Sequence, residues 1–394
     1  MPPQTSDRPL DLVLFGATGF TGGLTADYLA RTAPAGLRWA LAGRSLDKLE
    51  RVRDRLVAVD GRLADLELVQ ADTTDDAALA DLVGRTKVLV TTVGPYLTLG
   101  EPLLAACAEA GTDYVDLTGE PEFADRMYLA HHATAERTGA RIVHACGFDS
   151  VPHDLGAMYT VQQLQAAGPV TVRGVVRASG MFSGGTFHSA VGVFSRARQS
   201  SEAARQRRRI EPRPEGRRSR AVAGKPRRDT ALGLWLLPMP TIDPAVVARS
   251  GAALASYGPD FRYTHYAGTK TLRYAAAGAL GVSAVAVAAQ VRPVRNLLLG
   301  AIKQGEGPDE SRREASWFTV DFVGEGGGRT VHTRVSGGDP GYGETAKMLA
   351  ESALCLAFDD NPTTAGCVTT AQAMGENLMG RLVAAGITFE VVGV

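Results

Sequence analysis

The chain has 394 residues, and its 42 Lys and Arg residues balance 42 Asp and Glu residues, so its formal net charge is zero. A balanced charge gives no reason to expect nucleic acid as a partner, and this length is enough for two domains. The four cysteines lie without Cys-x-x-Cys spacing, which argues against a disulfide framework and a zinc site, so we expect no metal. The N-terminal segment is short and polar with no visible secretory signal, and we expect a cytoplasmic protein.

The predicted first strand, Leu10–Phe15, runs directly into the glycine-rich turn Gly16-Ala17-Thr18-Gly19-Phe20-Thr21-Gly22, and a helix is expected to follow. Glycines let such a turn bend sharply, let its N–H groups approach a pyrophosphate, and let the helix pack on the strand. The spacing is G-x-x-G-x-x-G, and the strand, turn and helix order favours a dinucleotide site over an ordinary tight turn. The predicted cofactor contacts here are Gly16, Thr18, Gly19, Phe20 and Gly22.

The predicted second strand, residues 37–42, leads to Arg44 and Ser45, where an NAD-specific domain would carry Asp or Glu. A guanidinium and a hydroxyl suit a 2′-phosphate, so the sequence favours NADP(H) as cofactor. The alternative is that Arg44 is simply solvated at the strand end. Asp72, after the strand predicted over residues 66–71, is expected to contact the adenine side or to cap the helix predicted over residues 75–83.

Strand and helix patterns alternate to about residue 150, which predicts an α/β fold with a Rossmann-type, doubly wound parallel sheet. Later strands are longer and alternating, and residues 317–323 and 330–336 are expected to pair as a hairpin. We therefore expect a dinucleotide-binding domain over residues 1–150 and an α+β domain for substrate or dimerisation over residues 151–342. Residues 343–394 are predicted to form a C-terminal helix and tail that pack at the domain junction.

Two segments of the second predicted domain are unusual. Residues 205–228 hold eleven Lys or Arg against two Glu, with three prolines, which predicts a mobile surface loop, or else a landing site for anionic lipid or a carrier protein. Residues 274–291 carry no charge but are too weakly apolar for a membrane span. We expect them to form a core or homodimer-interface helix, with peripheral membrane contact or a wall of an apolar substrate cavity as the alternatives.

Ligands of doubly wound sheets bind beyond the carboxyl ends of the strands, so the loops after the fourth, fifth and sixth predicted strands are candidates for the site. The first of these loops is Val93-Gly94-Pro95-Tyr96, which is expected to pass beside the nicotinamide ribose, with Tyr96 as a candidate proton donor. The second contains Gly119 and Glu120, and the third contains Asp149 and His153. The candidate catalytic residues are therefore Tyr96, His153 and Asp149, although Asp149 or Ser150 could equally cap the next helix.

Taken together, these motifs resemble the saccharopine dehydrogenase-like oxidoreductases, and within them the branch of trans-acting enoyl reductases. The stretches that carry the resemblance are residues 16–22, 43–45, 93–96, 114–120 and 147–152, with Ser183-Gly184-Gly185-Thr186 and Gly338-Asp339-Pro340-Gly341-Tyr342 in addition. The resemblance implies a Rossmann domain with an inserted α+β domain before a returning C-terminal part. It also implies NADPH-dependent reduction of double bonds in polyketide or terpenoid lipids, often beside membranes or on carrier-bound chains.

The leading functional hypothesis is an NADPH-dependent reductase of a carbon–carbon double bond in an apolar lipid, polyketide or terpenoid, free or carrier-bound. One alternative is an imine or amino-acid dehydrogenase of saccharopine type, which would need a cationic pocket. The other is a lipid-associated scaffold that binds NADPH without turnover.

Overall fold

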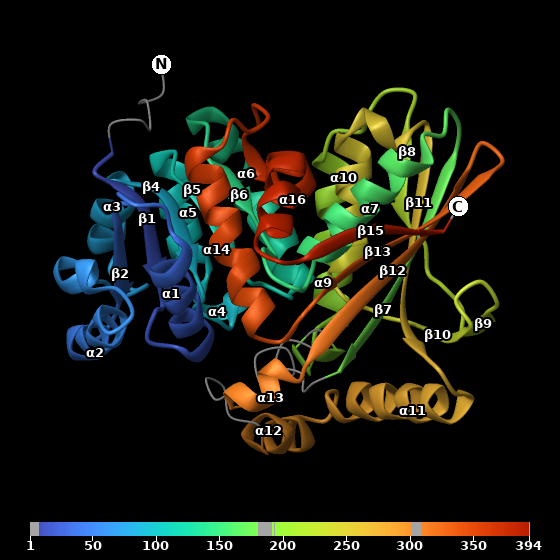
Figure 1. The fold of residues 1–394 in the computed structure, drawn as a ribbon, viewed down its shortest axis with the longest axis horizontal. Coiled ribbons are helices and arrows are strands. Elements are labelled where there is room, and N and C mark those ends of the chain that lie inside the picture. The colour runs from blue at the N-terminus through green and yellow to red at the C-terminus, as the bar shows by residue number, and fades with distance from the viewer. Residues whose placement is uncertain (1–7, 180–190, 193, 302–308, 394) are drawn as a thin grey trace.

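The computed structural model describes residues 8–179, 191–192, 194–301 and 309–393 of the chain. Its elements form two sheets that lie side by side (Figure 1). In the first sheet the strand order is β14-β6-β5-β4-β1-β2-β3, and every neighbouring pair is parallel. The expected Rossmann-type sheet is confirmed. Its strands are β1 (Leu10–Phe15), β2 (Trp39–Gly43), β3 (Glu67–Gln70), β4 (Thr86–Thr91), β5 (Asp113–Asp116), β6 (Arg141–Val143) and β14 (Gly366–Val368).

Both faces of this sheet are covered by helices, and β1 shows why its sequence is continuously apolar. Leu12 and Leu14 pack with α1, α2 and α14, while Val13 and Phe15 on the opposite face pack with α3, α5 and α6. A strand buried on both faces needs no polar alternation. The covering helices are α1 (Phe20–Thr32), α2 (Leu46–Val57), α3 (Asp76–Gly84), α5 (Glu101–Ala110), α6 (Pro121–Thr138) and α14 (Gly343–Phe358). The short elements α4 (Tyr96–Leu99) and η2 (Gly61–Asp65) lie in connections.

Residues with special backbone geometry set several helix ends. Gly111 and Gly139 end α5 and α6 in the left-handed conformation, with φ of 71° and 85°, a conformation that glycine adopts without a Cβ penalty. Pro121 begins α6, where the first-turn N–H is not needed. Gly111 and Gly139 lie in helix-to-strand connections, at the edge of the sheet opposite the site, whereas Pro121 follows the carboxyl end of β5, at the edge where the site lies.

The second sheet is mixed, with the order β15-β13-β12-β7-β11-β10-β9 and β8 paired to β11. Its β7–β11 and β8–β11 pairs are parallel, and its other pairs are antiparallel. The predicted hairpin is present as β12 and β13, with Gly327 and Gly328 in the turn at φ 58° and 75°. The strands are β7 (Val170–Ser179), β8 (Arg218–Ala221), β9 (Arg227–Asp229), β10 (Leu234–Pro238), β11 (Asp260–Thr269), β12 (Trp317–Gly326), β13 (Arg329–Gly337) and β15 (Thr388–Gly393).

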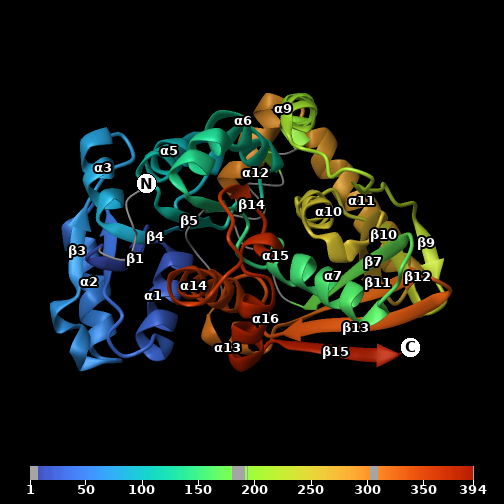
Figure 2. The same cartoon turned by 90° about the horizontal axis from the view of Figure 1, so that it is seen from above.

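The helices of the second half pack on this sheet or extend beyond it. Seen from above, α7 and α10 lie between the two sheets (Figure 2). The helices α11 and α12 lie behind the other elements in that view and along the bottom of Figure 1. These helices are α7 (Val151–Leu164), α9 (Ala197–Ile210), α10 (Asp243–Ala253), η3 (Ala255–Tyr257), α11 (Leu272–Ala288), α12 (Arg292–Ala301), α13 (Glu310–Glu314), α15 (Thr370–Ala373) and α16 (Gly375–Ala384). The motif at residues 183–186 lies outside the described residues.

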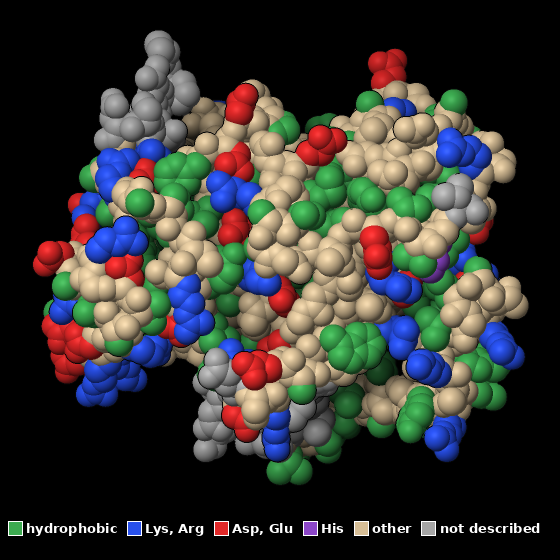
Figure 3. All heavy atoms as spheres, viewed as in Figure 1, with side chains coloured by type: hydrophobic (Ala, Val, Ile, Leu, Met, Phe, Trp, Pro, Cys, Tyr) green, Lys and Arg blue, Asp and Glu red, His purple; other side chains and the backbone are tan. Residues whose placement is uncertain are grey.

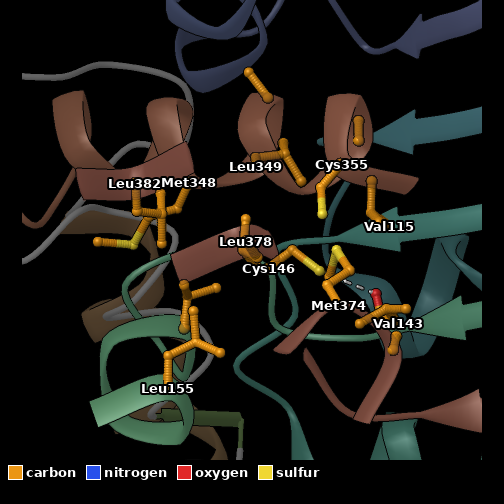
Figure 4. Packing of buried hydrophobic residues seen from close by; sticks show 14 of the residues in the cluster. Val115, Val143, Cys146, Leu155, Met348, Leu349, Cys355, Met374, Leu378 and Leu382 are labelled. Carbon is orange, nitrogen blue, oxygen red and sulfur yellow. Dashed lines mark hydrogen bonds between the residues drawn. The ribbon is translucent and has the colours of Figure 1, made fainter. Parts of the chain in front are cut away.

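The C-terminal part contributes to both sheets. Strand β14 extends the first sheet beside β6, and β15 extends the second sheet beside β13. The helices α14 and α16 pack against each other, and α14 also packs on α1 and α16 on α7. Residues 343–393 thus tie the two sheets together through one apolar cluster. Figure 4 shows that cluster with Val115, Val143, Cys146, Leu155, Met348, Leu349, Cys355, Met374, Leu378 and Leu382 labelled.

The prediction of a mobile loop over residues 205–228 is wrong. Its first residues complete α9, and further on it forms β8 and β9. Two of its cations make buried or half-buried contacts: Arg207 is buried between Asp125 and Glu211, and Arg217 donates to the backbone carbonyls of residues 251, 254 and 258, whereas the other nine are exposed. Arg207 therefore links α9 to α6, and Arg217 links the start of β8 to the end of α10.

Of the predicted alternatives for residues 274–291, the core helix is wrong, and the homodimer-interface helix stays a prediction. These residues do form a helix, α11, but its side chains are exposed, and Ala275 is the buried residue within its bounds. In the described part of the chain, no helix has the length and apolarity needed to cross a bilayer.

Candidate active site

A cavity of about 1030 Å³ opens at the carboxyl edge of the first sheet and continues to the second sheet. Most of the predicted site residues line it, and Ser45 and Asp72 do not. The predicted residues on its wall are Gly16, Thr18, Gly19, Phe20, Gly22, Arg44, Val93, Gly94, Pro95, Tyr96, Gly119, Glu120, Asp149 and His153.

The glycine-rich turn forms one end of this cavity. Gly16 has φ of 94°, and a Cβ there would clash with Val93 and Thr92. A Cβ on Gly22 would fall on the Gly16 carbonyl oxygen, so glycine is needed for α1 to pack against the turn. No side chain caps the first turn of α1, whose N-cap is Gly19. The N–H groups at this helix start are therefore available to an anion, as a dinucleotide pyrophosphate requires.

Arg44 lies exposed on the cavity wall directly after β2. Ser45 is the N-cap residue of α2, and its side chain makes no capping hydrogen bond. Asp72 accepts hydrogen bonds from the backbone N–H and the hydroxyl of Thr74, at 3.0 and 2.8 Å, and these lower its carboxyl pKa. It does not cap α3, because Asp75 does so at 3.0 Å from the Ala78 N–H.

The loop after β4 is held by side chains of the loop after β5. The two carboxylate oxygens of Glu120 accept from the backbone N–H groups of Tyr96 and Leu97, at 3.2 and 3.0 Å. The buried Tyr96 hydroxyl donates to the Thr91 carbonyl and accepts from the Leu117 N–H, both at 3.1 Å. Burial raises the Tyr96 pKa well above its ordinary value. Tyr96 and Glu120 therefore fix the loop that forms this wall.

Asp149 lies in the loop after β6, against the backbone of Gly119. A Cβ on Gly119 would approach the Asp149 Oδ2 to 3.1 Å, so a glycine leaves room for the carboxyl group. Burial, reinforced by the nearby Asp243 carboxylate, raises the Asp149 pKa to about 7. Ala145 and Ser150, at either end of this loop, both have positive φ, 59° and 151°. Strained backbone of this kind gathers at functional sites, where the surrounding structure holds it in place.

Behind Asp149, buried side chains from two elements, α10 and β11, meet His153 of α7. The His153 Nδ1 lies 3.1 Å from the Asp243 Oδ1, and the His265 Nε2 lies 3.7 Å from the Asp243 Oδ2. The two imidazole rings are 4.9 Å apart. The Tyr263 hydroxyl is hydrogen-bonded to the His265 Nδ1 at 3.1 Å. His153, Asp243 and His265 all line the cavity, and we call them the His–Asp–His cluster.

Burial keeps both histidines of the cluster neutral near neutral pH. It lowers the His153 pKa, and it lowers the His265 pKa to about 4, although Asp243 opposes both shifts. Asp243 is buried too, but its position beside the two rings lowers its pKa and keeps it ionised. Among the described residues, the Nε2 atoms of His153 and His265 have no hydrogen-bond partner. Unpartnered buried polar atoms on a cavity wall are suited to meet a polar group of a ligand.

Asp243, His265 and Tyr263 were missed by the sequence analysis. Asp243 precedes a proline at the start of α10 and looks like any helix-start residue. The alternation in β11 places Phe261, Tyr263 and His265 on one buried face, and that was the available signal. Nothing in the sequence indicated that this face meets α7.

The cavity wall beyond the His–Asp–His cluster carries both apolar and cationic side chains. Arg196 and Arg126 each pair with Glu122, at 2.6 and 4.0 Å, and the Arg177 guanidinium lies 5.5 Å from the centre of the Trp317 ring. These cations are therefore engaged in contacts within the protein. The apolar side chains on this wall are Val176, Ala178, Val191, Met239 and Ala267.

Comparison with known proteins agrees with this architecture. Residues 12–143 match the model of the saccharopine dehydrogenase NADP binding domain. Yeast saccharopine dehydrogenase (Saccharomyces cerevisiae, L-Glu forming, apo) superposes with a TM-score of 0.55 at 12% identity, covering 97% of this chain and 99% of that chain. At that identity the likeness shows the fold, which is of the saccharopine dehydrogenase type.

Sequence relatives extend over nearly the whole chain. A protein of Mycobacterium tuberculosis strain H37Rv, whose name places it provisionally among trans-acting enoyl reductases, is 39% identical over 418 residues, with 97% of each chain covered. A trans-acting enoyl reductase of Mycobacterium ulcerans is 34% identical, with 98% of each chain covered. An NADP-binding domain with relatives of this kind makes the chain an NAD(P)-dependent oxidoreductase that uses NADP(H). The chain belongs to the family of trans-acting enoyl reductases.

Proposed function

We propose that the protein reduces a carbon–carbon double bond conjugated to a carbonyl group, in an apolar lipid, polyketide or terpenoid substrate, free or bound to a carrier. The observation that carries the proposal is Asp149, a carboxyl group with a pKa near 7 in the same cavity as the glycine-rich turn. A carboxylic acid that keeps its proton near neutral pH can serve as a general acid.

The residues at the cofactor end fit NADP(H). The turn at residues 16–22 would hold the pyrophosphate through backbone N–H groups, and Arg44 with Ser45 would hold the 2′-phosphate. Val93, Gly94, Pro95 and Gly119 would form the wall beside the nicotinamide. When bound, NADPH supplies a hydride to the substrate double bond.

The proton that completes the reduction is assigned to Asp149. As hydride arrives at the β-carbon, negative charge develops on the α-carbon and the conjugated carbonyl oxygen. Asp149 donates its proton to the α-carbon and regains one from water. The Nε2 atom of His265, whose Nδ1 accepts from the Tyr263 hydroxyl, would carry the proton of that ring and donate it to the carbonyl oxygen. The neutral His153 ring would hold its proton on Nδ1, toward Asp243, so its Nε2 would accept rather than donate. Donors aimed at developing charge lower the barrier because they need no reorganisation.

Tyr96 is not assigned as the donor. Its hydroxyl proton already has the Thr91 carbonyl as acceptor, and its oxygen accepts from Leu117. Releasing that proton would take this donor away from the buried Thr91 carbonyl, at a cost of about 1–3 kcal/mol.

The saccharopine-type alternative requires cations that are free to bind a dicarboxylate amino acid. Arg126 and Arg196 reach the cavity but pair with Glu122, and Arg177 lies over the Trp317 ring, whereas Arg295 of α12 also lines the cavity. The engagement of the first three supports the enoyl substrate over a dicarboxylate amino acid, which needs several free cations.

The test supplies NADPH deuterated at the transferred position, with a long-chain 2-enoyl thioester in one arm and a 2-oxo acid with an amine donor in the other. We expect NADPH oxidation in the first arm and one deuterium at the β-carbon of the saturated product by mass spectrometry. Turnover of the second pair alone would replace this proposal with the amino-acid dehydrogenase. Tight NADPH binding with no turnover in either arm would favour the scaffold.

A further inference from the structure

The helices α11 and α12 present an apolar surface that the protein itself leaves uncovered. Leu280, Val287 and Leu297 are 72%, 68% and 75% exposed. We call this the α11–α12 surface. It lies along the lower edge of the molecule in Figure 1, and the space-filling view shows hydrophobic side chains with Lys and Arg, and some Asp and Glu, along that edge (Figure 3). Its other exposed apolar residues are Leu272, Tyr274, Val282, Val291 and Val294.

The helix α11 is exposed around its whole circumference in its middle part. Residues 276–284 are all exposed, which is more than two turns of consecutive positions. The helix is attached near its ends, through the buried Ala275 and Ala289 and through a hydrogen bond of 2.6 Å from the Gln290 side chain to the Phe194 carbonyl. A second copy of the protein pressed against the helix would cover one side, whereas lipid surrounds a helix on several sides.

Within the chain segment that forms the α11–α12 surface, every charged residue is basic, whereas α13 beside α12 carries acidic residues. The sequence contains no Asp or Glu between Asp260 and Glu306, a stretch that includes Lys270, Arg273 and Arg295. The Arg273 guanidinium lies 5.0 Å from the centre of the Tyr274 ring, at the start of the helix. Basic residues that border an apolar helix are attracted to anionic lipid headgroups while the apolar residues enter the acyl boundary.

The α11–α12 surface is also next to the cavity. Arg295 of α12 lines it together with Val191 and Gly192. A substrate that leaves a bilayer at this surface would meet the cavity without crossing bulk water.

We propose that the α11–α12 surface docks the protein on an anionic lipid bilayer, with α11 lying in the plane of the headgroups, and that apolar substrate enters the cavity from there. The docking itself is independent of the reaction, and the delivery of substrate rests on the proposed function.

The test is flotation of the full chain with vesicles of phosphatidylcholine, with and without phosphatidylglycerol. We expect binding to the anionic vesicles that weakens in high salt, because part of the attraction is electrostatic. The double variant Leu280→Asp/Val287→Asp should bind the anionic vesicles at least about tenfold more weakly, since it places two charges in the apolar surface.

The matched control is Val383→Asp on α16, a 51% exposed valine outside this surface, which should bind like the unchanged chain. Retained NADPH affinity and circular dichroism would show that the double variant is folded. Absence of binding to anionic vesicles, or equal binding by the double variant, would overturn the proposal. A dimer in light scattering that the double variant dissociates would also overturn it, by showing a second copy on this surface. Turnover of a short, water-soluble enoyl thioester tests the reaction separately, because that substrate needs no bilayer.

Discussion

The two ends of the cavity are formed by different kinds of chemical group, backbone at one end and titratable side chains at the other. The proposed cofactor end is a single turn of contiguous residues, where glycines and backbone N–H groups would form the site. The other end is made of titratable side chains, Asp149 and the His–Asp–His cluster, brought together from the β6–α7 loop, α7, α10 and β11. The cofactor end depends on the space that its glycines leave free, so NADPH affinity should be insensitive to pH near neutrality. The other end depends on burial, which sets its pKa values, and should respond strongly to pH and to charge changes.

Asp149→Asn should have the largest effect. It keeps the size of the side chain but removes the transferable proton, so kcat should fall by about 10²–10⁴-fold, the usual contribution of a general acid. NADPH affinity should change little, because the groups proposed to hold the phosphates are the glycine-rich turn and Arg44, whereas Asp149 lies against Gly119 of the nicotinamide wall. Steady-state kinetics measure kcat, and fluorescence titration with NADPH measures the cofactor affinity of the same variant. A kcat within a few-fold of the unchanged chain would remove Asp149 from the proposed mechanism.

The pH dependence of kcat in the unchanged chain also tests Asp149 as the general acid. A general acid works while protonated, so kcat should be high below pH 7 and fall as pH rises through the Asp149 pKa of about 7. The folded protein binds this proton up to about pH 7, whereas the unfolded chain releases it near the ordinary value of 3.8. The free energy of unfolding should therefore decrease between those values as pH rises, and Asp149→Asn should flatten that slope.

Gly22→Ala tests the cofactor end. The new Cβ would meet the Gly16 carbonyl oxygen, and relieving that clash moves the turn away from α1. Overpacking of this size costs about 1–3 kcal/mol, so we expect NADPH affinity to fall by roughly 5–150-fold. Gly380→Ala in α16 is the matched control, since nothing lies within 4 Å of its added Cβ. Equal NADPH affinity in both variants would place the pyrophosphate elsewhere.

Arg44→Ala should act on cofactor choice rather than on binding as such. Hydrogen bonds to a charged group contribute about 1.5–3 kcal/mol, so the preference for NADPH over NADH should fall by about tenfold or more. Calorimetric titration with both cofactors measures it. If the preference is unchanged, Arg44 is a solvated residue and another group binds the 2′-phosphate.

The first sheet and the cofactor turn were predictable because their signals are local. Leu10–Phe15 is apolar throughout, the glycines follow at once, and Arg44 comes directly after the next strand. The hairpin of β12 and β13 was predictable for the same reason. Composition was a poorer guide where tertiary contacts decide: Arg207 in the basic run is buried by Asp125, and the uncharged α11 is exposed.

The acid end could be predicted only in part. Asp149 and His153 follow a strand of the first sheet, so their place at the carboxyl edge was accessible from the sequence. Asp243 and His265 belong to elements about a hundred residues later, and only the packing of α10 and β11 against α7 brings them to His153. The raised pKa of Asp149 likewise results from burial and from the neighbouring Asp243, and no local sequence pattern indicates either cause.

Asp243→Asn has the smallest expected effect, and it separates the two causes of the raised Asp149 pKa, which are burial and the Asp243 carboxylate. Asp243→Asn removes the negative charge that adds to burial in raising the Asp149 pKa, so the midpoint of the kcat profile should move to lower pH by about one unit or less. His153 and His265 would lose an anion that favours their protonation, and both stay neutral, so they cannot cause a shift in this direction. The pH profile is the useful readout, because a merely structural loss would lower kcat at every pH and leave the midpoint in place. If the midpoint of the kcat profile does not move, burial alone raises the pKa of Asp149, and the role of Asp243 is limited to orienting His153.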